Sequence, residues 1–178
     1  MESENPDSGR LRFCAFFNLP SFQCKLLIPV ERINLFGRVS MKLKTTTIKQ
    51  KVLLAALPEE VYDALVNPRE HSEFTGSKAT GEARVGTKFT AWDGYISGKN
   101  LELEKGKRIV QEWVTTEWPE GYPPSRLEFT LSQIDGKTEL KMVHSNVPAE
   151  QKQELEQGWN DFYWKPLKDY FKKRRPEA

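Results

Sequence analysis

The feature that most limits what this chain can fold into is a series of six short segments with strand character, separated by turn residues. The segments are residues 77–83, 87–93, 95–103, 107–117, 126–134 and 137–145. Asp93-Gly94 and Asp135-Gly136 favour the type I′ turns that join antiparallel strands, and Val85-Gly86 and Lys105-Gly106 suit further turns. Strands with such short connections pair with their neighbours along the chain, so we expect an antiparallel meander.

One further strand and two short helices are expected before the meander. Residues 45–54 alternate between apolar and polar side chains, which is typical of a strand with one buried face. Pro58 suits the first turn of a helix. Asn67-Pro68 ends that helix and caps a second one, which stops at Gly76. The sheet should therefore hold about seven strands.

A long helix is expected to close the domain after Val147-Pro148. Bulky apolar side chains recur every three or four residues over 149–173, at Leu155, Trp159, Phe162, Tyr163, Leu167, Tyr170 and Phe171. Pro166 lacks a backbone donor and should bend this helix. The predicted fold class is α+β, with a curved antiparallel sheet of about seven strands around a long C-terminal helix and two short helices after the first strand.

The first forty residues differ from the rest in composition and pattern. They hold both cysteines and five of the ten phenylalanines, but their apolar residues follow neither a helical nor a strand period. Acidic residues at the start argue against a signal peptide, whereas the later arginines leave an organelle transit segment as an alternative. We favour an upstream extension ahead of Met41. Residues 1–40 would then be an irregular, disordered leader and residues 41–175 one domain.

Composition excludes several classes of protein. The 27 basic and 25 acidic residues give a net charge of only +2, whereas general nucleic-acid binders carry a strong basic excess. Two cysteines and two histidines are too few for a zinc module, and no apolar run approaches the roughly 20 residues that span a bilayer. We therefore expect no metal, no cofactor, no nucleic acid and no membrane span. The absence of cysteine after residue 40 is compatible with the cytoplasm.

No motif in the sequence supports catalysis. His71 is expected on an exposed short helix and His144 at the end of a strand, and neither lies in a motif that supplies a catalytic partner. Residues 41–178 contain no cysteine nucleophile and no phosphate-binding loop. An enzyme of the cyclase or hydrolase kind therefore stays a minor alternative.

A curved sheet closed by one bulky helix often leaves a concave apolar space, which is the preferred shape of a small-molecule site. Seven residues are expected to line it: Phe74, Trp92, Trp113, Phe129, Met142, Trp159 and Tyr163. The aromatic residues of the helix are first of all expected to be core, because a helix that packs on a sheet needs such a stripe. The sequence alone leaves the direction of these side chains open.

A second candidate surface is the proline-rich segment over residues 117–124. A loop between two strands has no packing need for a tryptophan, a tyrosine and three prolines, and rigid aromatic loops make good interface anchors. We expect its contact residues to be Trp118, Glu120, Tyr122 and Pro123. The alternative is a structural loop that folds over the mouth of the sheet.

Several strings, taken in this order, resemble one known family. They are Asp93-Gly94-Tyr95-Ile96-Ser97-Gly98, Trp118-Pro119-Glu120-Gly121, Val147-Pro148-Ala149, Gln157-Gly158-Trp159 and the ending over 163–171. Residues 43–173 thereby resemble the C-terminal domain of the activators of the heat-shock protein 90 (HSP90) ATPase, a branch of the START-like (SRPBCC) helix-grip superfamily. The resemblance implies a helix-grip fold with a central cavity and a co-chaperone role in contact with the chaperone. It carries over no catalytic residue.

Two functions follow as alternatives. The first is a non-catalytic binding domain that contacts an HSP90-type chaperone and modulates its ATPase, as part of a stress response in the cytoplasm. The second is a carrier or sensor of an apolar small molecule held between the sheet and the long helix. The eukaryotic activators have an additional N-terminal domain, and residues 1–40 are too short and irregular to supply one. The resemblance therefore does not by itself imply full activator function.

Overall fold

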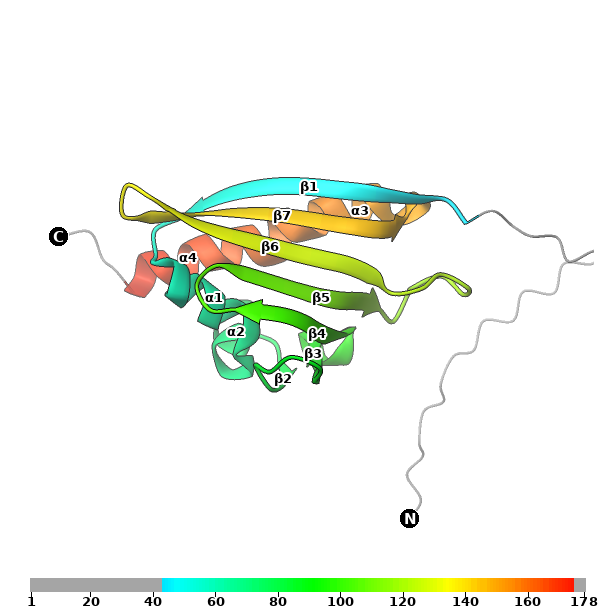
Figure 1. Cartoon of the computed structure of the whole chain (residues 1–178), viewed down its shortest axis with the longest axis horizontal. Helices are drawn as coiled ribbons and strands as arrows, with labels where there is room; N and C mark the ends of the chain where they lie inside the picture. The colour runs from blue at the N-terminus through cyan, green and yellow to red at the C-terminus, as the bar shows by residue number, and fades with distance from the viewer. Residues whose placement is uncertain (1–42, 175–178) are drawn as a thin grey trace, which may run out of the picture. The chain divides into compact units, whose positions relative to one another are not determined.

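The computed structural model describes residues 43–174, and the leader expected over residues 1–40 lies outside the described residues. Residues 43–174 contain a seven-stranded antiparallel sheet with the strand order β1-β7-β6-β5-β4-β3-β2 (Figure 1). The strands are β1 (Thr45–Leu54), β2 (Thr80–Gly81), β3 (Lys88–Ala91), β4 (Ile96–Glu104), β5 (Arg108–Thr115), β6 (Ser125–Ile134) and β7 (Lys137–Pro148). Strands β2 to β7 each pair with the next along the chain, which confirms the meander, and β1 pairs with β7.

Two turns have the expected type I′ conformation. Asp135 and Gly136, between β6 and β7, have φ angles of 49° and 73°. Asp93 and Gly94, between β3 and β4, have φ angles of 56° and 93°. Positive φ at both central residues matches the right-handed twist of the flanking strands, which is why Asp-Gly is favoured there.

The first two strands of the meander are shorter than the segments expected over 77–83 and 87–93. Strand β2 holds only two residues, and β3 ends at Ala91. The chain then forms the 3₁₀ turn η1 (Trp92–Gly94), because Trp92 takes a φ of 53° that no strand accommodates. At the other end of the meander, β7 runs three residues further than expected because its last residues pair with the start of β1.

Two short helices follow β1, as expected. Helix α1 spans Pro58–Val66 and α2 spans Pro68–Thr75. The Asn67 side chain accepts a hydrogen bond from the backbone N–H of Arg69 at 2.9 Å, which satisfies a free donor at the start of α2. Gly76 ends α2 in the left-handed conformation, with a φ of 73°.

The chain is helical again from Ala149 to Arg174 and crosses one face of the sheet (Figure 1). This C-terminal helix consists of η2 (Ala149–Gln151), α3 (Lys152–Gly158), the π-helical segment η3 (Trp159–Trp164) and α4 (Lys165–Arg174). The Lys165 N–H donates to the carbonyl of Asn160, five residues back. In a regular α-helix the ring of Pro166 would clash with the carbonyl four residues earlier, so the wider π turn accommodates the proline.

The core lies between the C-terminal helix and the inner face of the sheet. Its most buried apolar side chains alternate along the strands and include Ile48, Ile109, Leu127 and Leu140, with Leu167 from the helix. The predicted fold class is therefore confirmed. None of the described helices is long and apolar enough to cross a membrane.

Candidate binding cavity

A cavity of about 400 Å³ lies between the C-terminal helix and the adjoining ends of β4 and β5. Six aromatic side chains line it: Trp92, Tyr95, Trp113, Trp159, Phe162 and Tyr163. We call this space the aromatic cavity. Its volume falls in the range of small-molecule sites, which are concave and mostly apolar.

Two irregular backbone segments place most of these rings. The positive φ of Trp92 in η1 turns the chain out of the strand direction at the cavity wall, where its ring lies 5.5 Å from that of Phe162. The π-helical segment η3 supplies Trp159, Phe162 and Tyr163 to the lining. Both a bulky residue at positive φ and a π turn are uncommon, and both occur preferentially at functional sites.

Four polar side chains also line the aromatic cavity: Thr115, Glu117, Gln151 and Glu154. The carboxylate of Glu117 accepts a hydrogen bond of 2.7 Å from the Tyr95 hydroxyl, and burial and this carboxylate raise the pKa of Tyr95. Gln151 donates through Nε2 to the backbone carbonyl of Glu117 at 2.8 Å. Its Oε1 is buried and has no hydrogen-bond partner among residues 43–174.

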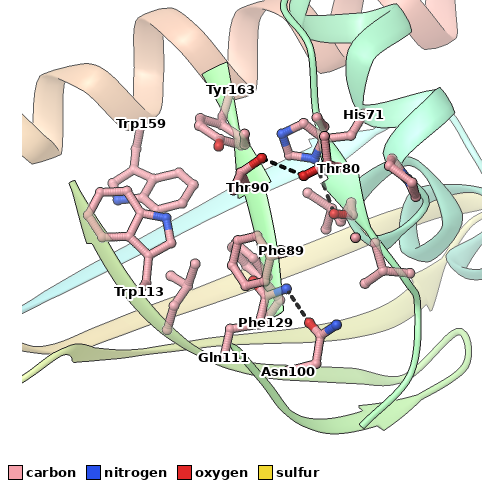
Figure 2. Close-up of a pocket in the computed structure, with 17 residues that line it drawn as sticks. His71, Thr80, Phe89, Thr90, Asn100, Gln111, Trp113, Phe129, Trp159 and Tyr163 are labelled. Atoms are coloured by element: carbon pink, nitrogen blue, oxygen red, sulfur yellow. Dashed lines mark hydrogen bonds between the residues drawn. The ribbon is translucent and has the colours of Figure 1, made fainter. Parts of the chain in front are cut away.

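A second, much smaller cavity of about 30 Å³ is lined by residues of α1, α2, strands β2 to β6 and the C-terminal helix (Figure 2). Trp113, Trp159 and Tyr163 line both cavities and so form the wall between them. The small cavity is edged by polar pairs that Figure 2 marks with dashed lines, including Gln111 Nε2 donating to Asn100 Oδ1 at 2.8 Å. A space of this size holds no more than about two water molecules.

His71 faces the small cavity, and the expectation that it lies on an exposed helix is wrong: it is buried. Its Nδ1 lies 3.2 Å from the carbonyl oxygen of Leu65, so Nδ1 carries the proton and donates. Its Nε2 is then an acceptor, buried without a partner in the described part of the chain. Burial lowers the pKa of His71.

His144 is fully buried inside β7, and the expectation that it closes a strand is also wrong. Trp159 Nε1 lies 3.2 Å from its Nδ1, and an indole N–H can only donate, so Nδ1 is the acceptor. Nε2 therefore carries the proton and donates to Ser125 Oγ at 2.7 Å, which in turn donates to the carbonyl of Trp113 at 2.6 Å. Burial lowers the pKa of His144 to about 3.

This direction of proton donation decides the role of the Ser125–His144 pair. A histidine that activates a serine must accept the serine proton, whereas here the imidazole donates and the serine proton is directed to a backbone carbonyl. The pair is a satisfied structural network. Among residues 43–174, no three His, Cys, Asp or Glu side chains are grouped in a way that could hold a metal ion.

The seven residues expected to line a cavity do not all lie in one place. Trp92, Trp113, Trp159 and Tyr163 line the aromatic cavity, and Phe129 lines the small cavity. Two of the seven line neither. Met142 is buried in the sheet, and Phe74 packs against His71 and Tyr163 with ring centroids 4.8 and 6.0 Å away.

Sequence reasoning missed nine residues that line the aromatic cavity: Tyr95, Ile96, Thr115, Glu117, Gln151, Glu154, Leu155, Gly158 and Phe162. The signal for Phe162 was present, because it belongs to the same helical stripe as Trp159 and Tyr163. The polar residues gave no signal, since they come from the end of β5, the following loop and the first turns of the C-terminal helix. Only the tertiary fold brings these segments together.

The proline-rich loop over residues 117–124 folds onto the domain. Trp118 is half-buried, its ring lies 6.0 Å from that of Trp113, and its Nε1 donates to the carbonyl of Pro123 at 3.1 Å. The Tyr122 hydroxyl donates to the backbone carbonyl of Lys44 at 3.3 Å. Glu120 and Pro123 are exposed. The aromatic residues of the loop thus hold its shape, while Glu120 and Pro123 present its surface.

The family model and the curated relatives that match this chain point to the same family. The family model described as "Activator of Hsp90 ATPase homolog 1-like protein" matches residues 55–172. The human activator of 90 kDa heat shock protein ATPase homolog 1 is 36% identical over 135 residues, which are 75% of this chain and 39% of that protein. The Dictyostelium discoideum homolog is 34% identical over 128 residues, 70% of this chain and 33% of that protein. The chain spans about two-fifths or less of the length of these curated relatives.

Solved structures show the same fold. The crystal structure of an HSP90 activator from Plasmodium falciparum matches with a TM-score of 0.64 and 22% identity, and covers 70% of this chain and 94% of that one. The solution structure of the Aha1 dimer from Colwellia psychrerythraea matches with a TM-score of 0.61 and 21% identity, over 71% of this chain and 96% of that one.

Proposed function

The chain belongs to the activator of Hsp90 ATPase homolog 1-like family, and from this membership we propose that it is a non-catalytic domain that binds an HSP90-type chaperone and modulates its ATPase. The observation that carries the proposal is the 36% identity to the human activator over 135 residues. The sequence expectation that this family is present is thereby confirmed. A chaperone partner of this kind also agrees with the expected cytoplasmic location.

The proposed contact surface is the loop over residues 117–124. Its half-buried Trp118 and its Tyr122 fix the loop against the domain, so Glu120 and Pro123 are presented without a large loss of conformational entropy on binding. A partner can change the ATPase rate of a chaperone only if it binds one chaperone conformation more tightly than another. We therefore expect nucleotide-dependent affinity.

The test is a titration of purified HSP90 with the full chain of 178 residues, with and without ATP, followed by an ATPase assay. We expect saturable binding that ATP strengthens and a change in the ATPase rate at saturation. Glu120→Arg should weaken binding by about tenfold, because it reverses an exposed charge at the proposed contact. Gln133→Arg is the matched control, since Gln133 is exposed near the opposite end of β6.

A folded protein that shows no HSP90 binding in either nucleotide state would refute the chaperone proposal. Equal weakening by Glu120→Arg and Gln133→Arg would instead place the contact outside the loop. Trp118→Ala is a poor probe of the contact, because loss of its packing on Trp113 would also lower stability.

The aromatic cavity supports a second function, the carriage or sensing of a small molecule. The specific observation is a space of about 400 Å³ with six aromatic rings in its wall. Native mass spectrometry of the full chain should detect a co-purifying small molecule. Leu155→Trp, which adds bulk at the cavity wall, should abolish that signal, and Leu155→Met should retain it. Absence of any ligand, and of any binding in the titrations below, would refute this function.

A further inference from the structure

The polar residues of the aromatic cavity have a one-sided charge. Glu117 and Glu154 both contribute to its lining, whereas no lysine, arginine or histidine among residues 43–174 does. Neither carboxylate forms an ion pair with a basic side chain of residues 43–174. Most carboxylates on the outer face of the sheet do pair; Glu102, for example, lies 2.5 Å from Arg108. The cavity therefore combines an apolar wall with unneutralised negative charge.

The hydrogen-bonding groups of the cavity are also mostly acceptors. Glu117 uses one carboxylate oxygen to accept from Tyr95, which leaves the other free. The Oε1 of Gln151 is buried without a partner, because its amide Nε2 is turned toward the carbonyl of Glu117. A buried acceptor that lacks a donor is costly, so it favours a ligand that supplies an N–H group. Among residues 43–174, the Trp92 indole N–H is the one buried donor at the cavity wall that lacks a hydrogen bond of good geometry.

The aromatic wall suits a cation as well as an apolar body. Ring faces carry partial negative charge, and tryptophan attracts a cation most strongly among the aromatic residues. Three of the six rings are indoles, from Trp92, Trp113 and Trp159. Organic ammonium ions are bound in aromatic-walled sites by this attraction together with nearby carboxylates. A carboxylate ligand of the same size would instead meet Glu117 and Glu154 with like charge.

We propose that the aromatic cavity binds a small amphiphilic organic cation, with its apolar body among the aromatic rings and its ammonium group toward Glu117, Glu154 and the Oε1 of Gln151. This inference rests on the second proposed function and names its ligand class. It is independent of the chaperone proposal, because the contact residues Glu120 and Pro123 do not line the cavity.

Three probes of matched shape separate charge from shape: 1-naphthylmethylammonium, 1-naphthylmethanol and 1-naphthoate. Isothermal titration of the full chain at pH 7 should show the ammonium ion binding about tenfold more tightly than the alcohol, with no detectable binding of the carboxylate. The preference for the ammonium ion over the alcohol should decrease as the salt concentration is raised, because the carboxylates of Glu117 and Glu154 are exposed to solvent.

Variants then locate the charge effect. Glu117→Gln and Glu154→Gln should each reduce the preference for the ammonium ion by about threefold, and the double variant should bind the ammonium ion and the alcohol equally. Glu150→Gln is the matched control, because Glu150 is exposed on the same helix but does not line the cavity. Circular dichroism should show that each variant is folded.

The outcomes distinguish this inference from the function on which it rests. Equal binding of the alcohol and the ammonium ion by the unmodified chain would keep the carrier function and overturn the cation. Tightest binding of 1-naphthoate would overturn the cation as well. Failure of all three probes, together with no ligand in the native mass spectrum, would overturn both.

Discussion

His144 shows what a single buried side chain contributes to this fold. It accepts from Trp159 and donates to Ser125, so one imidazole connects β6, β7 and the C-terminal helix. Both ring nitrogens are satisfied only in the neutral form. The protonated ring would place an N–H opposite the indole N–H of Trp159.

The pH dependence of stability follows from this network. The pKa of His144 is about 3 in the folded protein against 6.5 ordinarily, so the unfolded chain binds more protons between these values. Its stabilising contribution is complete above pH 6.5 and is lost as the pH falls toward 3. The loss is on the order of 4 kcal/mol across that window. Urea unfolding at pH 7, 5 and 4 measures it.

The pKa of His144 can also be measured directly on the unmodified protein, which needs no variant that must fold. The ¹³C-edited NMR spectrum of the His144 ring should show a neutral imidazole down to pH 4. A ring that titrates near pH 6.5 would contradict the assigned hydrogen bonds. His144→Gln, where it folds, should lose part of the pH dependence between pH 6.5 and 4.

Replacing glycine by alanine should have opposite effects on stability at Gly98 and at Gly158. A Cβ at Gly98 would lie 2.0 Å from the backbone oxygen of Glu112 and 2.7 Å from the ring of Phe89, so Gly98→Ala should destabilise by about 3 kcal/mol or more. A Cβ at Gly158 meets only a Phe162 ring atom, at 3.8 Å. Gly158→Ala should stabilise by about 0.5–1 kcal/mol, because glycine weakens a helix. Thermal unfolding of both variants tests the pair, and equal effects would contradict it.

At the scale of elements, the C-terminal helix joins a structural irregularity to the cavity. The π-helical segment η3 carries three of the six aromatic cavity residues, and it ends two residues before Pro166. The proline explains why the irregularity lies at this place in the helix. The wider turn in turn sets where Phe162 and Tyr163 point.

Pro166→Ala tests this connection. A restored N–H at residue 166 can donate to the carbonyl of Phe162, which favours a regular α-helix and moves the rings of η3. Stability should change by no more than about 1 kcal/mol, whereas affinity for 1-naphthylmethylammonium should fall severalfold. Hydrogen exchange would show a protected amide at residue 166. A rapidly exchanging amide with unchanged affinity would mean that packing of Trp159 and Trp164, not the proline, dictates the π turn.

At the scale of the whole molecule, the two proposed functions occupy separate surfaces. The loop over residues 117–124 presents Glu120 outward, while Glu117 at its start and Thr115 just before it line the cavity. Neighbouring residues thus serve different surfaces because β5 ends at the cavity and the loop then turns away from it.

A double dissociation follows from this separation. Leu155→Trp should abolish binding of the naphthyl ammonium ion and leave HSP90 affinity within about twofold, because the proposed contact residues Glu120 and Pro123 do not line the cavity. Glu120→Arg should do the reverse. Loss of both activities in either variant, with the fold intact, would show that cavity and loop are coupled.

The sequence by itself determined the order of elements, the meander, the type I′ turns and the family. These follow from local patterns such as Asp135-Gly136 and from side-chain periodicity, and local backbone preferences act over a few residues in any context. Much of the aromatic wall could also be predicted from the sequence, since Trp159 and Tyr163 belong to one apolar stripe of the predicted helix. The predicted strand ends were wrong where a residue departs from the regular backbone conformation, notably at Trp92, whose positive φ shortens β3.

Only the tertiary structure decided which side chains share the cavity and which charges they bring. Glu117, Gln151 and Glu154 come from a loop and from the start of the C-terminal helix, and they meet Tyr95 from a different turn. His71 and His144 likewise became buried through contacts with distant segments. Burial and convergence depend on how the helix lies across the sheet, and no period or motif within one segment encodes that placement.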